Sequence, residues 1–480
     1  MKLKDLLHNV DVLELHADPE LEISAVSSDT REDFGPGTLF VALSGFAFDG
    51  NRFIPMAAQK GAVAVVTAKK PELDIPYILV ENDRVALARI GANFYGRPAD
   101  QMTMIGVTGT NGKTSVTWLL KQVLQQVTGE KVGLIGTMEN HIGDQVLSTD
   151  RTTPESIQLQ RLFAQMVDAG CKYAVMEVSS HAIALHRVEG IHFAVGAFTN
   201  LTEDHLDFHE NMEHYGATKA QLFHRCDKAV VNRDCPWGQR MVAGKAISVI
   251  TTSVDGCGDL MAKDMVFNRD GVDFTVVFGG KSAFIHVPIP GKFTVYNVLT
   301  VLGIAVQLGI SLEDAAQALK TVKGVKGRVE VVPTPGKEYT VLIDYAHTPD
   351  GLENVLSAVR GFCKGRLIAV FGCGGDRDRK KRPVMGGIGV RLADLAVITS
   401  DNPRTEEPAA IIDDILAGLG NATNYVVVEN RIKAIHYAME IGKKDDIIVL
   451  AGKGHETYQE VNGVKYHMDE REIVAEYLEN

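Results

Sequence analysis

The segment from residue 104 to residue 119, M-I-G-V-T-G-T-N-G-K-T-S-V-T-W-L, contains the residues with the clearest chemistry. Gly109 and Gly112 allow the backbone to turn its N–H groups toward one point, Lys113 adds a positive charge, and the Thr114 hydroxyl can bind Mg²⁺. The spacing differs by one residue from the Walker pattern, but the final G-K-T is kept. These residue types predict a loop that binds nucleotide phosphates; a structural turn is the alternative.

The residues on either side of this loop predict the elements that must hold it. An apolar strand with Ile105 and Val107 precedes the loop, and apolar residues at helical spacing follow it. The candidate ATP-binding residues of the loop are Gly109, Thr110, Asn111, Gly112, Lys113, Thr114 and Ser115.

Polar residues also follow several other apolar runs. Ligands of open parallel sheets bind beyond the carboxyl ends of the strands, so these positions are candidates for a catalytic cleft. Taken singly, each cluster could equally be a polar cap or a turn; together, beside a phosphate loop, they favour the cleft. The clusters are residues 177–181, 199–207, 344–347, 374–377, 401–404 and 452–456.

These residue types suit a reaction in which MgATP phosphorylates a carboxylate and an amine then captures the acyl phosphate. Phosphoryl transfer requires neutralised charge, which Lys113 and the loop amides supply. Thr114 and Glu177 offer hard oxygen ligands for one Mg²⁺, and His205 is a candidate for a second. A lone histidine is more commonly structural, so residue type alone leaves the role of His205 open.

The 480-residue chain reads as three α/β blocks, with boundaries at residues 1–100, 101–330 and 331–480. After Thr252 the pattern indicates a small antiparallel patch with a turn at 268–271, before a helix near Val295. Apolar strand-like runs lie at 23–26, 38–43, 62–66 and 77–80, at 131–136, 173–178, 194–199 and 229–232, and at 341–345, 367–372, 396–401, 426–429 and 447–452.

Composition excludes several classes of protein. The net charge of −12 argues against nucleic acid as a partner. The six cysteines have neither zinc-site nor disulfide-framework spacing, which indicates reduced thiols. No signal peptide or run of membrane-spanning length is found, so we expect a cytoplasmic protein without membrane insertion.

The chain resembles the Mur ligase family over essentially its whole length. The motifs that carry the resemblance are T-G-T-N-G-K-T (108–114), M-E-V-S-S-H (176–181), T-N-L-T-E-D-H-L-D-F-H (199–209), G-R-V-E (327–330) and D-Y-A-H-T-P-D (344–350). The resemblance implies a monomeric α/β protein of three domains. These are a uridine-nucleotide-binding N-terminal domain, a central P-loop domain with a parallel sheet, and a Rossmann-like C-terminal domain that binds an amino acid.

Further motifs resemble the family members that add the third amino acid of a cell-wall peptide. They are S-S-D-T-R (27–31), R-T-T-P (151–154), G-C-G-G-D-R-D (372–378), D-N-P-R (401–404) and A-G-K-G-H-E (451–456). The implied reaction joins meso-diaminopimelate to UDP-N-acetylmuramoyl-L-alanyl-D-glutamate in peptidoglycan precursor synthesis, with ATP as co-substrate, two Mg²⁺ ions and no redox cofactor.

The resemblance also implies roles for individual residues. Lys219 would be carbamylated and would join Thr114, Glu177 and His205 as a metal ligand, although by sequence alone it reads as a helical surface lysine. Catalysis would rest on Lys113, Glu177, His205 and Lys219. Asn297 and Arg328 would contact adenine and phosphate respectively, with Asp344 and His347 nearby. The uridine nucleotide and dipeptide would bind Ser28, Thr30, Thr152, Thr153, Ser179, Leu185 and Arg187, beside the loop 45–50.

Some relatives carry glutamine where this chain has Leu185, so that contact stays open. In the family, Arg404 marks enzymes for diaminopimelate, whose second carboxylate a guanidinium can bind through two oxygens. The implied amino-acid pocket consists of Arg377, Asp401, Asn402, Pro403, Arg404, Gly452 and Glu456.

Other functions remain as alternatives. A lysine-adding ligase of the same family would not need Arg404, because lysine has no second carboxylate. A folylpolyglutamate synthetase shares the P-loop and the acyl phosphate chemistry but not the N-terminal uridine-binding domain. A kinase or a nucleotide-gated switch would use the P-loop alone and would need no amine substrate.

Overall fold

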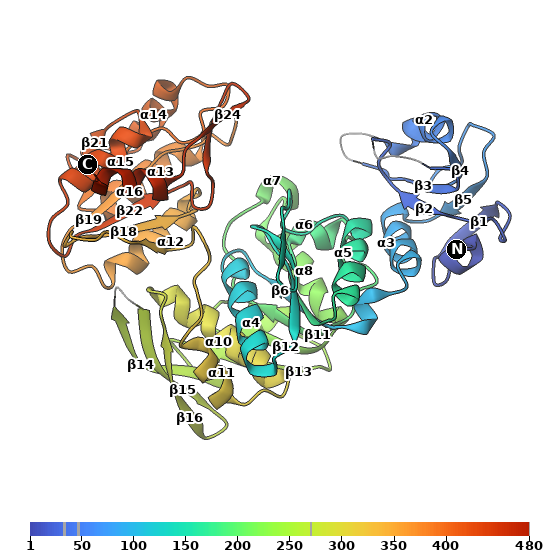
Figure 1. Ribbon diagram of the computed structural model, residues 1–480, viewed down its shortest axis with the longest axis horizontal. Helices are drawn as coiled ribbons and strands as arrows, with labels where there is room; N and C mark the ends of the chain where they lie inside the picture. The colour runs from blue at the N-terminus through green and yellow to red at the C-terminus, as the bar shows by residue number, and fades with distance from the viewer. Residues whose placement is uncertain (32–34, 46–48, 269–270, 480) are drawn as a thin grey trace.

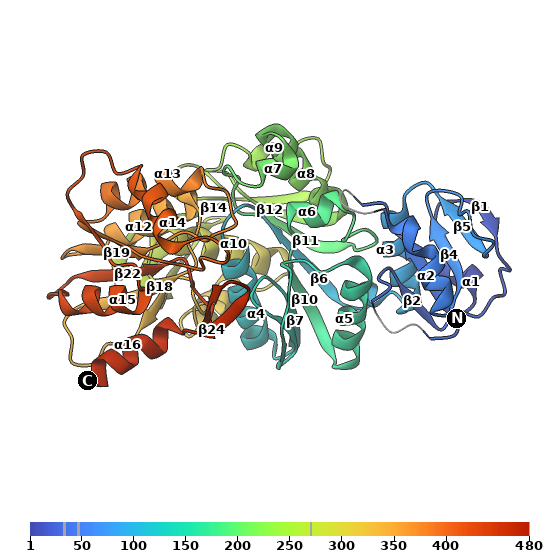
Figure 2. The ribbon, with the colours of Figure 1, turned by 90° about the horizontal axis from the view of Figure 1, so that it is seen from above.

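The computed structural model describes residues 1–31, 35–45, 49–268 and 271–479. Three α/β lobes follow one another along the long axis, and the chain termini lie in the two outer lobes, at opposite ends (Figure 1). The view from above shows the same order (Figure 2). Each lobe has its own sheet, so the expected three α/β units are present.

The first lobe contains a five-stranded sheet of order β1-β5-β4-β3-β2. The four expected strands are present. The edge strand β1 was not expected, because most of its residues are exposed and it lacks a buried apolar run. The elements are α1 (Leu3–Leu6), β1 (Val12–His16), β2 (Ala25–Ser27), β3 (Thr38–Ala42), η1 (Gly50–Phe53), α2 (Ile54–Gln59), β4 (Ala62–Thr67), β5 (Tyr77–Val80), α3 (Asp83–Phe94) and η2 (Pro98–Gln101).

The central lobe contains an 11-stranded sheet of order β16-β15-β14-β13-β12-β11-β6-β10-β7-β8-β9. Its middle strands are parallel and their residues are almost all buried, as the apolar runs predict. The elements are β6 (Thr103–Thr108), α4 (Lys113–Thr128), β7 (Lys131–Ile135), β8 (Asn140–Ile142), β9 (Gln145–Leu147), α5 (Ser156–Asp168), β10 (Cys171–Glu177), α6 (Ser180–Ala184), β11 (Phe193–Phe198), α7 (Leu206–His209), α8 (Met212–Ala220), η3 (Gln221–Arg225), β12 (Cys226–Asn232), α9 (Gly238–Met241), β13 (Ser248–Ser253), β14 (Leu260–Asn268), β15 (Gly271–Phe278), β16 (Lys281–Val287), α10 (Lys292–Gln307) and α11 (Leu312–Leu319).

The expected antiparallel strands after Thr252 are β14, β15 and β16. They do not form a separate patch, because β14 pairs in parallel with β13 and so extends the central sheet. The centre of the expected turn, Arg269 and Asp270, lies outside the described residues.

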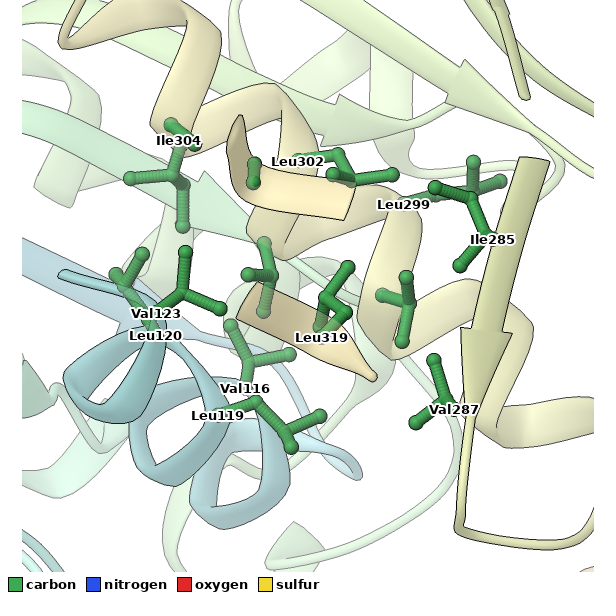
Figure 3. Packing of buried hydrophobic residues seen from close by; sticks show 14 of the residues in the cluster. Val116, Leu119, Leu120, Val123, Ile285, Val287, Leu299, Leu302, Ile304 and Leu319 are labelled. Atoms are coloured by element: carbon green, nitrogen blue, oxygen red, sulfur yellow. The ribbon is translucent and has the colours of Figure 1, made fainter. Parts of the chain in front are cut away.

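Helix α4, which begins at the phosphate loop, is fixed by an apolar face. Val116, Leu119, Leu120 and Val123 recur at helical spacing and are buried against residues of α10, α11 and β16 (Figure 3). Helix α10 is buried over most of its length and lies against the sheet. The core therefore fixes the N-terminal end of α4, and with it the loop, relative to the strands.

The third lobe contains a six-stranded sheet of order β17-β18-β22-β19-β20-β21 and a separate hairpin, β23-β24. The five expected strands, β18 to β22, are parallel to one another. The elements are β17 (Glu330–Val332), β18 (Thr340–Asp344), α12 (Pro349–Arg360), β19 (Leu367–Phe371), α13 (Lys381–Leu392), β20 (Leu395–Ile398), α14 (Pro408–Leu416), β21 (Tyr425–Val427), α15 (Arg431–Glu440), β22 (Ile447–Ala451), β23 (Tyr458–Val461), β24 (Val464–His467) and α16 (Glu470–Glu479).

Within the described ranges, no helix combines the length and the apolar composition that crossing a membrane requires. All six cysteines are free in the structure.

Candidate active site

Two glycines of the phosphate loop occupy positions where a larger residue would collide with its neighbours. Gly109 has φ +149° and Gly112 has φ +86°. A Cβ atom on Gly109 would lie 1.9 Å from the Thr199 hydroxyl, and one on Gly112 would lie 2.6 Å from the Asn297 amide oxygen. The loop therefore passes between the end of β11 and the start of α10 so closely that only glycine fits.

The segment after β11 holds the loop from one side. The backbone N–H of Thr110 donates to the Asn200 carbonyl oxygen at 2.9 Å, and the N–H of Asn111 donates to the Asn200 side-chain oxygen at the same distance. The Thr199 hydroxyl donates to the Asn111 carbonyl oxygen at 2.6 Å. Thr199 and Asn200 stand in a strand-end cluster that was singled out, but their support of the loop was not predicted.

The Lys113 ammonium folds back over the loop. Its Nζ donates to the carbonyl oxygens of Gly109 and Thr110, both at 2.8 Å. Burial lowers the pKa of Lys113, while the charges of Glu177 and Asp204 act in the opposite direction. Among the residues that the structure describes, no carboxylate pairs directly with this ammonium, which is held at the centre of the loop where it can meet a phosphate.

Oxygen ligands suitable for Mg²⁺ lie beside the loop. The Thr114 hydroxyl donates to Glu177 Oε2 at 3.1 Å, and Glu177 is 1% exposed. Thr137, at the end of β7, donates to the same carboxylate through its hydroxyl at 3.0 Å and its backbone N–H at 2.8 Å. Hard oxygen donors at the start of a helix fit a magnesium ion. Thr137 was missed, although its place directly after an apolar strand is a signal that could have identified it.

Lys219 lies in the site and not on the surface of α8. It is 1% exposed, its Nζ donates to the Gly109 carbonyl oxygen at 2.9 Å, and the amine lies 4.5 Å from the ring centre of Tyr215. Burial and, to a lesser degree, the charge of Lys113 hold the pKa of Lys219 well below its usual value. The alternative of a surface lysine is excluded, and a neutral amine is the form that can add CO₂.

His205 lies close to the same group. Its ring is 4.8 Å from that of His181, and its Nε2 lies 3.4 Å from Asp204. Burial lowers the pKa of His205 against the opposing effect of Asp204. No group of three or more His, Cys, Asp and Glu side chains suited to a metal ion occurs in the described part of the chain. The candidate metal ligands are therefore a mixed set that also includes a threonine and a lysine.

The residues expected to bind the dipeptide continue outward from Glu177. The hydroxyls of Thr137 and Thr152 lie 3.0 Å apart, with Thr152 as the donor because Thr137 donates to Glu177, and the Thr153 hydroxyl donates to the Glu177 carbonyl oxygen at 2.8 Å. The Ser179 N–H donates to the Thr153 hydroxyl at 3.2 Å. These hydroxyls form a polar row that begins at the phosphate loop.

Arg187 lies at the outer end of this row. One guanidinium nitrogen donates to the Thr153 carbonyl oxygen at 3.1 Å, and another lies 2.7 Å from Glu155. Its Nε is buried without a hydrogen-bond partner among the described residues. Leu185 ends helix α6, where its N–H donates to the His181 carbonyl oxygen.

Ser28 and Thr30 follow strand β2 in the first lobe. Thr30 is buried, and its carbonyl oxygen accepts a bond from Lys60 at 2.7 Å. Within the described ranges, no hydrogen bond or ion pair joins Ser28 or Thr30 to the central lobe. Residues 46–48 of the loop expected beside them lie outside the described residues.

The expected adenine-side residues meet between the central and third lobes. Ser115, Asn297 and Arg328 line one small cavity, together with apolar residues that include Leu119 and Phe293. The Arg328 guanidinium lies 5.1 Å from the ring centre of Tyr345, and its buried Nε has no partner among the described residues. Arg328 is thus oriented by stacking, with donor capacity left for a ligand.

Asp344 and His347 support this region from the end of β18. Asp344 accepts the N–H groups of Val329 and Ala346, both at 2.8 Å, and burial raises its pKa. His347 Nδ1 lies 2.8 Å from the Tyr345 carbonyl oxygen. Asp344 therefore fixes the backbone beside Arg328.

Asp350, in the first turn of α12, joins the third lobe to the phosphate loop. Its Oδ2 accepts from the Asn111 side chain at 2.6 Å and from the Thr202 hydroxyl at 3.0 Å. This contact was not predicted, because residues 239 positions apart meet only through the arrangement of the lobes.

The expected amino-acid pocket gathers two loops of the third lobe. The Asn402 side chain donates to Glu456 Oε2 at 2.9 Å, and a Cβ on Gly452 would lie 2.6 Å from Asp401 Oδ2. Arg377 is exposed and donates to the carbonyl oxygen of Asp376 at 3.1 Å. Pro403 is buried between Asn402 and Arg404.

Arg404 is held by a hairpin that was not predicted. Its Nη1 donates to the Gly375 carbonyl oxygen at 2.8 Å, and its Nε lies 3.3 Å from Glu460 on β23. The Arg404 backbone N–H donates to the Glu460 carbonyl oxygen, and the Arg404 carbonyl oxygen accepts from the N–H of Asn462. The sequence Asn462-Gly463, with φ +49° and +77°, is a typical hairpin turn and could have revealed β23-β24.

A buried ion pair supports the segment after Arg404. Arg382 has a fully buried side chain and lies 2.7 Å from Glu406 and 2.8 Å from Asp414. The bond from Arg382 lowers the pKa of Glu406 to about 2.

Comparisons with known proteins agree with this geometry. Family models match nearly the whole chain: the Mur ligase middle domain at residues 107–305, the Mur ligase, glutamate ligase domain at 327–454, and the Mur ligase family, catalytic domain at 22–95.

Individual relatives match over full length. The chain is 47% identical to a UDP-N-acetylmuramoyl-L-alanyl-D-glutamate–2,6-diaminopimelate ligase of Clostridium tetani, over 100% of this chain and 99% of the relative. It is 48% identical to the protein of that name from Caldanaerobacter subterraneus subsp. tengcongensis, with the same coverage. A solved structure described by the same enzyme name has a TM-score of 0.75 at 30% identity and covers 100% of this chain and 99% of its own.

Proposed function

The chain belongs to the Mur ligase family, and from that premise we propose that it joins meso-diaminopimelate to UDP-N-acetylmuramoyl-L-alanyl-D-glutamate with hydrolysis of ATP to ADP and phosphate. It is an ATP-dependent ligase of peptidoglycan precursor synthesis. The observation that carries the proposal is the presence of a phosphate loop and a D-N-P-R segment in one chain, whose third lobe contacts the phosphate loop through Asp350.

The reaction has two steps. The γ-carboxylate of the D-glutamate attacks the γ-phosphorus of ATP, and ADP leaves to give an acyl phosphate. The amine of diaminopimelate then attacks the acyl carbon, loses a proton and displaces phosphate. Lys113 and the N–H groups of Gly112 to Ser115 hold the β- and γ-phosphates, because their positive charge meets the charge that develops during transfer. Asn297 contacts adenine and Arg328 a phosphate, with Asp344 and His347 beside them.

Two Mg²⁺ ions fit the donor set on the phosphate side. Thr114 and Glu177 would hold the first, and His205 with a carbamylated Lys219 would hold the second. Bound Mg²⁺ supplies neutralisation of phosphate charge. The buried amine of Lys219, with its depressed pKa, supports carbamylation. Glu177, Lys113, His205 and Lys219 form the catalytic group.

The uridine nucleotide occupies the first domain (1–100) at Ser28 and Thr30. The muramoyl dipeptide follows the hydroxyl row of Thr152, Thr153 and Ser179 past Leu185 and Arg187 toward the phosphate loop of the central domain (101–330). The C-terminal domain (331–480) binds diaminopimelate. Arg404 takes a carboxylate and Glu456 an ammonium, with Arg377, Asp401, Asn402, Pro403 and Gly452 forming the remaining wall.

We also propose that the protein acts as a cytoplasmic monomer without nucleic acid or membrane partners. The lysine-adding alternative conflicts with Arg404, because lysine offers no second carboxylate for a guanidinium. The full-length relatives disfavour a folylpolyglutamate synthetase, a kinase or a switch.

A phosphate-release assay tests the proposed function. Purified protein with MgATP should release phosphate when both UDP-MurNAc-dipeptide and diaminopimelate are present, and omission of either should remove the activity. Phosphate release without peptide product, or without need for the amino acid, would contradict the proposal.

A panel of amino acids, analysed by product mass, tests the choice of substrate. We expect meso-diaminopimelate to be incorporated and lysine to be a poor substrate. Equal incorporation of lysine would overturn the assignment of Arg404.

A further inference from the structure

The turn Gly452-Lys453-Gly454 lies between the two sides of the proposed site. Gly452 has φ +115° and Gly454 has φ +54°. A Cβ on Gly454 would lie 2.6 Å from the Tyr345 Cβ, on the nucleotide side, whereas one on Gly452 would meet Asp401, on the amino-acid side. The backbone of this turn is therefore confined by contacts on both sides.

Lys453 is a fully buried lysine with two short bonds. Its Nζ donates to Asn402 Oδ1 and to Glu456 Oε2, both at 2.7 Å, and its side chain is 0% exposed. It also lies 5.1 Å from the ring centre of Tyr458. The two acceptors stand on different loops, 54 positions apart in the chain, and both belong to the proposed diaminopimelate pocket.

The charge of Lys453 has a specific consequence for Glu456. The Glu456 side chain is only 14% exposed, and a carboxylate so shielded from water is costly unless it is paired, so removal of the ammonium leaves its charge less well compensated. Without the ammonium, Glu456 would retain the bond from the Asn402 amide, and Asn402 would lose a donor to its own oxygen. Asn402 Oδ1 would keep the backbone N–H of Glu460 as a donor at 2.9 Å, but the two bonds that join the loops through the ammonium would be lost.

We propose that Lys453 is a positioning residue that holds Asn402 and Glu456 in the geometry required to bind the incoming amino acid. This inference rests on the proposed function, because it assigns the pocket to diaminopimelate. Lys453 acts through its two neighbours and does not need to touch the substrate.

The test is steady-state kinetics of the full-length Lys453→Met variant, with each substrate varied in turn. We expect the KM for diaminopimelate to rise about 30-fold, since bonds to charged groups are lost, and the KM for ATP to change by less than about 3-fold. Lys453→Gln keeps N–H donors without the charge and should raise the diaminopimelate KM about 5-fold. If the methionine variant does not fold, the glutamine variant serves the same comparison.

Lys465→Met is the matched control. Lys465 is exposed on β24, and its amine lies 4.2 Å from the same Tyr458 ring. We expect this control to keep both KM values. Equal changes in both KM values for Lys453→Met or Lys453→Gln would indicate a merely structural role and overturn the inference, as would unchanged values. Wild-type protein that forms no diaminopimelate product would instead refute the proposed function.

Discussion

The phosphate loop of the central lobe and the D-N-P-R segment of the third lobe both follow parallel strands, yet they are held in different ways. The phosphate loop is fixed by backbone bonds to Asn200 and by glycines that leave no room for a Cβ. The D-N-P-R segment also has backbone bonds, from Arg404 to the β23-β24 hairpin, but here side-chain charges add to them, including the pairs Arg382–Glu406 and Lys453–Glu456. Under the proposed function, we therefore expect the phosphate-binding step to depend mainly on backbone shape, and the choice of amino acid to depend also on side chains that can be replaced individually.

The largest expected effect tests the backbone side of this comparison. Gly109→Ala places a Cβ 1.9 Å from the Thr199 hydroxyl at a φ of +149°, so the loop must move. Because displacement of about 1 Å in a catalytic site costs on the order of 100-fold, we expect kcat/KM for ATP to fall by about that factor or more. Phosphate release measures the loss.

Gly129→Ala is its control. Gly129 lies at the other end of α4 with φ +72° and open space around it, so activity should remain near wild type. Comparable losses in both variants would show that the loop is not uniquely constrained.

The second prediction addresses the side-chain part. Arg404→Ala should raise the KM for diaminopimelate about 50-fold, because a charge-assisted contact is removed, while the KM for ATP stays within about 2-fold. Arg391→Ala, which removes an exposed pair with Glu353 in the same lobe, should change neither constant. An unchanged diaminopimelate KM in Arg404→Ala would refute the role of Arg404.

The third prediction separates the lobes by pH. Burial lowers the pKa of His209 to about 4, whereas Glu406 in the third lobe has a pKa of about 2. As pH falls below 6.5, His209 binds a proton in the unfolded chain but not in the folded protein. The free energy of unfolding of the central lobe should therefore fall by about 2 kcal/mol by pH 5. The contribution of Glu406 is complete above about pH 4.5 and is lost as pH falls from there toward 2.

Thermal unfolding at pH 7.5 and pH 5 checks this difference. The wild-type central lobe should lose more stability between these values than that of His209→Gln, whose amide can still bond to Ser180. Identical shifts in the two proteins would contradict the pH assignment.

The smallest expected effect concerns the hairpin that holds Arg404. Gly463→Ala introduces a side chain at φ +77° in open space, so it should cost about 1 kcal/mol and raise the diaminopimelate KM only about 2-fold. Gly280→Ala has the same kind of turn position at φ +79° in the distant β15-β16 hairpin. Gly280→Ala should have a similar stability cost and leave the KM for diaminopimelate unchanged. A change in that KM in Gly280→Ala would show that the effect of Gly463→Ala is not specific to the β23-β24 hairpin.

The sequence allowed the three-lobe fold to be predicted because buried parallel strands produce uninterrupted apolar runs, such as 173–178 and 447–452. It did not reveal β1, whose residues are mostly exposed, and it missed β23-β24 despite Asn462-Gly463. Local sequence patterns indicate burial and turns, but the residues of an edge strand are mostly exposed, so such a strand lacks the apolar pattern of burial.

The candidate site was predictable at the residues that stand in motifs, and less so at those that support them. Thr137 follows an apolar strand and could have been identified from that position, whereas Asp350 reaches the phosphate side through long-range packing that no spacing encodes. Lys219 could not be assigned from its position in the sequence alone, because only the three-dimensional structure distinguishes a buried amine from an exposed helical lysine.

The contact between Arg404 and Glu460 has a consequence for how the pocket discriminates. Glu460 supplies a carboxylate to the guanidinium before any ligand arrives. The second carboxylate of a diamino acid can replace Glu460 as the partner of Arg404. A diamino acid without that carboxylate offers no new partner for the guanidinium. If Arg404 binds the second carboxylate as proposed, selection arises from the difference in free energy between two competing ion pairs.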